Sequence, residues 1–251
     1  AGPVLPLDTL ERALRNGETL PPGSVLTFDD GYREHLDVVA PWLATRGHSA
    51  TFYVATGLCG DGESVAAVDA WYWLLDHATR RLGEVRMPDG GVFRAPLDTL
   101  EGKRAWVGGP PKAALLSASA RVQKALLDAL ADSAGCVLPV DLASLLYVRA
   151  SEWSGFGHQG MRVGAHSVGH PRLTQTDDMQ LEREVRDSVA AVARVRSLVA
   201  FAYPDGAFDD RVVASVRRAG VSSSVTCEPG DVAAGADLLR LPRRFVATPA
   251  A

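Results

Sequence analysis

Cysteine is scarce in this 251-residue sequence: Cys59, Cys136 and Cys227 stand far apart, and no Cys-x-x-Cys pair occurs. The odd number and the wide spacing argue against a disulfide framework and against a cysteine-based zinc knot. We interpret Cys136 and Cys227 as small apolar residues packed in the interior. The composition suits a reducing compartment, and we expect a cytoplasmic protein.

Long apolar runs and an excess of positive charge are also missing. No run approaches the roughly 20 apolar residues of a membrane-spanning helix, and no signal peptide is recognisable. The formal net charge is −4, which argues against a partner bound through its phosphate groups. We therefore expect no membrane span and no nucleic-acid partner, while the sequence leaves the oligomeric state open.

What the sequence does contain is an ordinary globular mixture, with 47% hydrophobic and 22% charged residues. Its first readable elements alternate between strand and helix. A strand is expected over 24–28, directly before Asp29-Asp30-Gly31, then a helix over Glu34–Thr45 and a strand over 50–55. This order predicts a parallel strand–helix–strand unit.

Between about 60 and 160 the alternation breaks down, and we interpret this region as a mainly helical insertion in a single domain spanning 1–251. A separate helical subdomain is the alternative. The elements expected here are helices over 70–81, 113–134 and 140–147, a hairpin over 85–93 and a loop over 108–111.

Strands and helices alternate again after 160, which predicts a (β/α) barrel or a doubly wound sheet. Both architectures gather chemistry at the carboxyl ends of their strands. Asp29, Asp30, His166 and the turn Tyr203-Pro204-Asp205 are all expected at such ends. The expected strands are 161–165, 198–202, 221–226 and 239–246, and the expected helices are 177–194 and 209–219.

Two adjacent carboxylates, Asp29 and Asp30, follow the first strand. Like charges this close raise each other's pKa, and a bound cation relieves the conflict. Because successive side chains point in different directions, one carboxylate can bind a metal while the other stays free as a base. The simpler interpretation is an ordinary Asp-Asp-Gly turn.

His166 and His170 are four residues apart, a spacing that lets both rings face one ion. Neutral imidazole suits zinc and similar metals, and two histidines with one carboxylate leave positions open for water and substrate. The alternative is one surface histidine and one buried structural histidine. The same donor set also occurs in iron oxygenases, for which oxygen dependence would be the test.

A rigid turn, Tyr203-Pro204-Asp205-Gly206, follows the strand expected over 198–202. Its backbone amides could stabilise an oxyanion, and we expect Tyr203 and Pro204 to contact the substrate. A plain strand-to-helix loop, capped by Asp205 or Asp209, is the alternative.

The segments Thr27-Phe28-Asp29-Asp30-Gly31 and His166-Ser167-Val168-Gly169-His170, followed by a Pro-x-Gly turn, resemble the motifs of carbohydrate esterase family 4. These are the polysaccharide deacetylases, or NodB-homology domains. The resemblance covers about 25–57 and 162–246. It implies a deformed (β/α) barrel of about seven strands, in the branch that carries a long insertion between the two motifs.

The activity of this family is hydrolysis of an acetyl group on a sugar. The resemblance implies that Asp29 is the general base, that Asp30, His166 and His170 bind one divalent metal ion, and that the Asp205 backbone amide stabilises the oxyanion. Zinc is the expected metal, with cobalt, nickel and manganese as alternatives. The expected substrate is an N-acetylated amino sugar within a polysaccharide, a lipid-linked sugar or a glycosylated metabolite.

Two departures from the family pattern matter. Ala202 stands where many members carry an arginine, and we hypothesise that Arg243, or else Arg240, supplies the guanidinium that tethers the base. Many members also use a C-terminal histidine as general acid, whereas no histidine follows His170. A sugar-binding barrel with little or no activity is therefore the competing hypothesis, and metal analysis with an acetate-release assay would separate the two.

Overall fold

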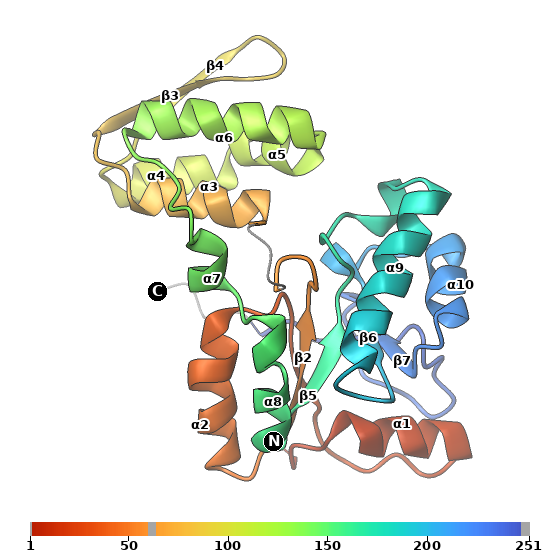
Figure 1. Ribbon diagram of the computed structural model, residues 1–251. Helices are drawn as coiled ribbons and strands as arrows, with labels where there is room; N and C mark the ends of the chain where they lie inside the picture. Colours follow the sequence, from red (N-terminus) through yellow and green to blue (C-terminus); the bar gives the residue numbers. More distant parts are fainter. Residues whose placement is uncertain (1, 60–63, 247–251) are drawn as a thin grey trace. The chain divides into compact units, whose positions relative to one another are not determined.

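The computed structural model describes residues 2–59 and 64–246. The chain divides into two compact units, each with its own core (Figure 1). The first unit combines Ala1–Gly62 with Ala143–Ala251, and the second spans Glu63–Leu142. The second unit therefore lies within the region where the sequence predicts an insertion.

The first unit is built on a five-stranded, all-parallel sheet with the strand order β1-β2-β5-β6-β7. All residues of β2, β5, β6 and β7 are buried, as expected for parallel strands covered by helices. The sheet curls, and this fold is a deformed (β/α) barrel, as the sequence predicts (Figure 1). The strands are β1 (Leu26–Phe28), β2 (Ala50–Val54), β5 (Arg162–Ala165), β6 (Ala200–Ala202) and β7 (Ser223–Val225).

Two single-residue parallel bridges extend the barrel at its ends. Val4 pairs with Ser24 just before β1, and Leu241 pairs with Val225 of β7. The prediction of a strand over 239–246 is therefore wrong, because only Leu241 of this segment pairs with the sheet. The next residue is Pro242, which has no N–H group to continue a ladder. The predicted number of about seven strands corresponds to five strands and these two bridged segments.

Helices surround the sheet of the first unit. α9 buries the apolar stripe that the sequence predicts, and Asp177 and Asp209 cap α9 and α10 by accepting bonds from Gln180 and Val212 amides. The sequence did not predict α1. The helices are α1 (Leu7–Asn16), α2 (Ala40–Ala44), α8 (Ser154–His158), α9 (Asp178–Ala193) and α10 (Asp210–Arg218), with a π-helical turn over His35–Val39 and with α7 (Leu142–Leu146) at the boundary between the units.

The second unit packs four helices with the predicted hairpin around a tryptophan-rich core that includes Trp71 and Trp106. The predicted loop at 108–111 is wrong, because α4 ends at Gly108 and Pro110 opens α5, a position where proline is favourable. The predicted helix over 113–134 is two helices. The elements are α3 (Ala67–Asp76), β3 (Leu82–Arg86), β4 (Val92–Pro96), α4 (Leu100–Gly108), α5 (Pro110–Ser117) and α6 (Ala120–Ala134). No helix of the described residues is long and apolar enough to cross a membrane.

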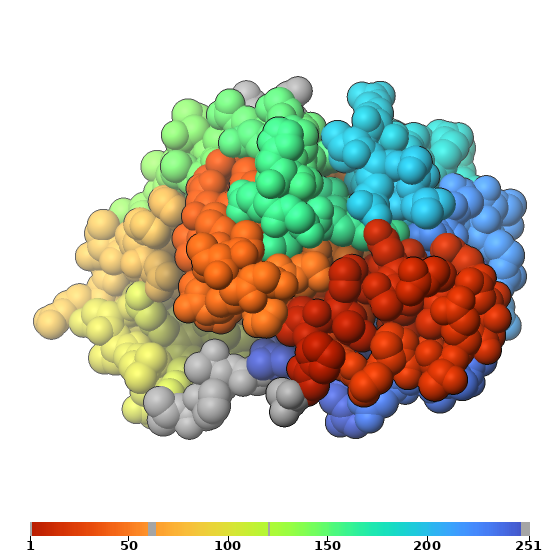
Figure 2. Space-filling view, turned by 90° about the horizontal axis from the view of Figure 1, so that it is seen from below, coloured from red at the N-terminus to blue at the C-terminus, as the bar shows by residue number. Residues whose placement is uncertain are grey.

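α1 lies at the amino ends of the strands, on the side seen from below (Figures 1 and 2), and a buried ionic network joins it to the sheet. Glu11 of α1 is 1% exposed and Arg162 of β5 is 5% exposed. The Arg162 guanidinium donates to both carboxylate oxygens of Glu11, at 2.9 and 3.2 Å. The hydroxyls of Ser222 and Ser223 also donate to Glu11. Four donors to one buried carboxylate fix α1 to the base of the barrel.

We predict that Glu11→Ala destabilises the protein by ~3 kcal/mol, because it removes the buried carboxylate that pairs with Arg162 and the acceptor of the Ser223 hydroxyl. Arg162 then keeps only the more exposed carboxylate of Asp8. The matched control is Glu18→Ala, which removes only exposed contacts, the pair with Arg12 and a hydrogen bond from Asn16, and should cost less than about 1 kcal/mol. Urea unfolding followed by circular dichroism measures both. Equal losses in the two variants would refute the structural role of Glu11.

Candidate active site

Asp30, His166 and His170 converge at the carboxyl ends of β1 and β5. The Asp30 Oδ1 atom lies 3.4 Å from His166 Nε2 and 3.3 Å from His170 Nε2. The two Nε2 atoms are 3.1 Å apart. One donor atom from each residue thus falls within 4.8 Å of the others, and the three side chains predicted as metal ligands form one cluster.

The ring of His166 is held in one orientation. It is 1% exposed, and its Nδ1 lies 2.7 Å from the carbonyl oxygen of Ala202 at the end of β6. A carbonyl can only accept, so Nδ1 carries a hydrogen, and the neutral form of this ring would present the lone pair of Nε2 to the cluster. An outer hydrogen bond of this kind orients metal-bound histidines in many proteins.

The charges of the cluster suit a bound cation. Burial raises the pKa of Asp30, but the hydrogen bond and charge of His166 outweigh it, so the pKa of Asp30 lies below its ordinary value. Burial and the neighbouring His166 both lower the pKa of His170. A carboxylate and two imidazole nitrogens facing one point form a donor set that fits a divalent metal such as zinc.

The backbone around the cluster is strained. Asp30, Ser167, His170 and Asp205 have φ values of 74°, 61°, 57° and 54°. In the part of the chain that the structure describes, these are the only residues other than glycine with positive φ. This conformation is unfavourable for side chains with a Cβ and concentrates at functional sites. All four belong to the segments that the sequence singles out.

Asp29 lies beside the cluster but pairs with Arg243 instead of joining it. Arg243 Nη1 and Nη2 each lie 2.8 Å from one oxygen of Asp29, in a bidentate geometry. The guanidinium also donates to the Thr226 carbonyl at 2.8 Å and to Thr27 Oγ1 at 3.2 Å. Burial raises the pKa of Asp29, but the bonds from Arg243 outweigh it and the pKa is lowered. The other candidate, Arg240, pairs with Asp210.

The turn over Pro204–Gly206 follows β6 on the same side of the barrel. Asp205 is exposed, and its carboxylate lies 3.6 Å from Arg172 Nε. Tyr203 is fully buried and donates its hydroxyl to the Leu239 carbonyl at 2.8 Å, and Pro204 is also buried. Because both side chains are buried, Tyr203 and Pro204 could contact a ligand only through their backbone atoms.

The cysteines lie closer to the site than the sequence indicates. Cys227, predicted to be interior, is exposed, and that prediction is wrong. Its Sγ lies 3.7 Å from Arg243 Nη2. Gly206 packs against Cys227 so closely that a Cβ at position 206 would clash. The buried Cys59 donates to the Asp30 carbonyl at 3.1 Å. Neither contact leaves a local sequence signal, since each joins segments distant in the chain.

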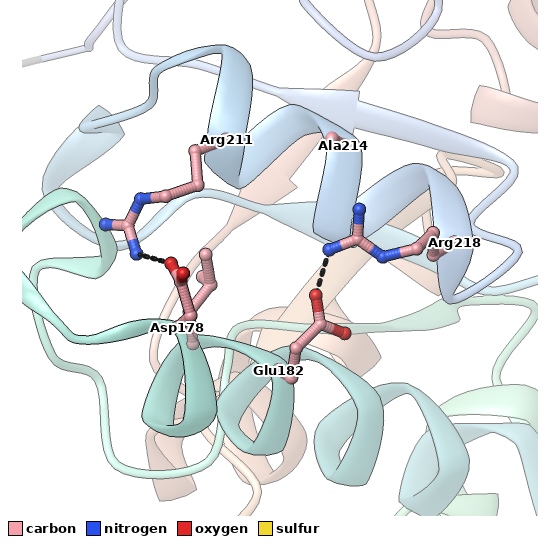
Figure 3. Close-up of a pocket in the computed structure, with 6 residues that line it drawn as sticks. Asp178, Glu182, Arg211, Ala214 and Arg218 are labelled. Carbon is pink, nitrogen blue, oxygen red and sulfur yellow. Dashed lines mark hydrogen bonds and ion pairs between the residues drawn. The ribbon is translucent and has the colours of Figure 1, made fainter.

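A separate hollow lies between α9 and α10 (Figure 3). Arg211 pairs with Asp178 across it at 2.9 Å, and Arg218 pairs with Glu182. Its charged groups thus neutralise one another, and none of its lining residues belongs to the cluster at the strand ends. The remaining lining residues are Leu181 and Ala214.

Residues 151–224 match the family model described as polysaccharide deacetylase. The deacetylase PplD of Streptococcus pyogenes, solved in complex with acetate, superposes with a TM-score of 0.58 at 19% identity, over 96% of this chain and 72% of that one. A de-N-acetylase from Aggregatibacter actinomycetemcomitans gives 0.56 at 13%, over 99% and 80%. IcaB from Ammonifex degensii gives 0.54 at 15%, over 97% and 81%. No curated protein sequence matches the chain.

We predict that the metal-free protein binds one Zn²⁺ or Co²⁺ per chain. Asp30→Ala and His166→Ala should each weaken metal binding at least ~100-fold, because each removes a donor atom. Loss of a residue that only hydrogen-bonds to a metal ligand has a smaller effect. His158→Ala is the control, since this histidine is exposed and outside the cluster. Isothermal titration calorimetry measures all four proteins. Unchanged affinity in His166→Ala would exclude the cluster as the metal site.

Proposed function

We propose that the chain is a member of carbohydrate esterase family 4 and acts as a metal-dependent hydrolase that removes the acetyl group from an N-acetylated amino sugar. The family and the fold support a carbohydrate deacetylase. The observation that carries the finer proposal is a division of labour: Asp30 faces the two histidines, while the adjacent Asp29 faces Arg243. The Asp29-Asp30 dipeptide thereby supplies one carboxylate that can bind a metal ion and one that can accept a proton.

Asp30, His166 and His170 would hold the metal ion. Zinc suits two imidazoles and one carboxylate best, and cobalt, nickel or manganese could occupy the same donors. When bound, a metal ion of this kind lowers the pKa of a coordinated water and polarises the acetyl carbonyl. The protein's contribution is to hold the three donors, one from a buried and two from half-buried side chains, in a preorganised arrangement.

Asp29 is the proposed general base. The bidentate bonds from Arg243 keep its carboxylate ionised and fix its orientation, so it can accept the proton of the attacking water. Arg243 therefore takes the tethering role that the sequence assigns to it by hypothesis.

Attack of water on the acetyl carbon places negative charge on the carbonyl oxygen. The backbone amide of Asp205 is the proposed donor to this oxyanion. Its turn has the left-handed backbone conformation described above, and it sits beside Arg172 at the rim of the site.

The leaving nitrogen must also receive a proton, and Asp29, protonated by the attacking water, is the group of the proposed site that can return it. The sequence contains no histidine after His170, and this observation favours a second candidate function, a sugar-binding barrel with little or no hydrolytic activity. Acetate release from chitin oligosaccharides by the zinc-loaded protein, measured alongside binding of the same sugars, separates the two. Sugar binding and bound metal without acetate release would favour the second function.

We predict that Asp29→Asn lowers the rate of acetate release by about 10²- to 10⁴-fold, the usual contribution of a general base. The variant should still bind one metal ion with near wild-type affinity, since Asp29 is not a donor of the cluster. Kinetics and calorimetry on the same preparation test both halves. A near wild-type rate would contradict the assignment of Asp29 as the base.

We predict that Arg243→Ala lowers kcat about 10- to 100-fold, the equivalent of losing charge-assisted hydrogen bonds of ~1.5–3 kcal/mol that hold the base. The matched control is Arg244→Ala, the next residue, whose exposed guanidinium pairs only with Asp231 among the described residues. An unchanged kcat in Arg243→Ala, or an equal fall in both variants, would exclude the tethering role.

A further inference from the structure

Glu184 of α9 contacts the segment that carries both histidines. One oxygen of its carboxylate, Oε2, accepts hydrogen bonds from the backbone amides of Val168 at 2.9 Å and Gly169 at 2.8 Å. These two residues lie between His166 and His170. Glu184 is half-buried and is not a member of the donor cluster. A carboxylate from a helix thus closes a concave pair of amides, the geometry in which backbone N–H groups bind anions.

The opposite edge of the same segment is held by the loop after β2. The amides of Thr56 and Gly57 donate to the carbonyls of Ser167 and Val168, at 3.0 and 2.8 Å. The Ser167 hydroxyl accepts from the His170 amide at 3.0 Å. The carbonyls of the segment therefore face β2 and its free amides face α9, so Glu184 is the partner that completes its hydrogen bonding.

This support matters because the segment has an unfavourable backbone. Ser167 and His170 both have positive φ, a conformation that costs of order 1–3 kcal/mol per residue and persists only where surrounding contacts enforce it. Relaxation at either residue would turn the His170 ring away from His166 and Asp30. His166 has its own anchor at Ala202, whereas His170 depends on the segment itself.

We propose that Glu184 is a positioning residue for the metal site: its carboxylate holds the 166–170 segment in the strained conformation that brings His170 Nε2 to the cluster. This inference rests on the proposed metal site, but it names a residue that neither coordinates a metal nor faces the substrate. Its effect is transmitted through two backbone amides.

The test compares Glu184→Ala and Glu184→Gln with Glu182→Ala. Glu182 lies on the same helix and pairs with Arg218 across the hollow between α9 and α10 (Figure 3), so it controls for loss of a carboxylate from α9. The first readout is the Zn²⁺ dissociation constant, measured by competition with a chelator. The second readout is hydrogen exchange of the Val168 and Gly169 amides in the metal-free protein.

Glu184→Ala should weaken Zn²⁺ binding about 10- to 100-fold, the range found for outer partners of metal ligands, and should speed exchange of both amides. Glu184→Gln should fall between Glu184→Ala and the wild type, because its amide oxygen still accepts but carries no charge. Glu182→Ala should match the wild type in both readouts.

Wild-type exchange rates at Val168 and Gly169 in Glu184→Ala would overturn the positioning role, as would a zinc affinity within about 2-fold of that of the wild type. If the wild-type protein itself binds no zinc, the proposed function fails, and the exchange readout still decides whether Glu184 holds the segment. If Glu184→Ala does not fold, Glu184→Gln carries the comparison, and equal values for it and the wild type would overturn the proposal.

Discussion

The ion pair between Asp29 and Arg243 joins residues 214 positions apart in the chain. One follows β1 and the other follows the segment bridged to β7, so a single side-chain contact links the two edges of the curled sheet. The same guanidinium reaches Thr27 and the Thr226 carbonyl. One residue therefore links the two sheet edges and also orients the proposed base, and this residue comes from the last described segment of the chain.

Much of the fold and site could be predicted because the relevant signals are local. Alternating strands and helices specify a parallel sheet, and parallel strands bring their carboxyl ends to one rim. Asp29, Asp30 and His166 each follow a strand directly, so their proximity follows from topology alone. The strand predicted over 239–246 does not form, because Pro242 lacks the N–H group that a strand ladder requires. The apolar pattern on which the prediction rests does not take this missing donor into account. The sequence also does not predict α1. The burial of its Glu11 depends on the distant Arg162 and leaves no local signal.

Contacts that join distant segments left no comparable signal. Glu184 resembles any other charged residue of a helix, and only the structure brings it to the amides of Val168 and Gly169. The close contact between Gly206 and Cys227 likewise joins two segments that are distant in the sequence. Arg243 was an intermediate case: the missing arginine at Ala202 indicated that a replacement should exist, while its position required the folded chain.

The buried pair of Glu11 and Arg162 also bears on how the chain can be divided. α1 is a short amphipathic segment near the N-terminus, the kind of element that is often trimmed when a domain is prepared in isolation. Here its carboxylate neutralises a cation 5% exposed in the central part of the sheet. A fragment beginning after Asn16 would retain every strand and every proposed site residue, yet leave an uncompensated charge in the barrel interior. For this protein, the folded unit that carries the proposed site includes α1, which precedes the first sequence motif.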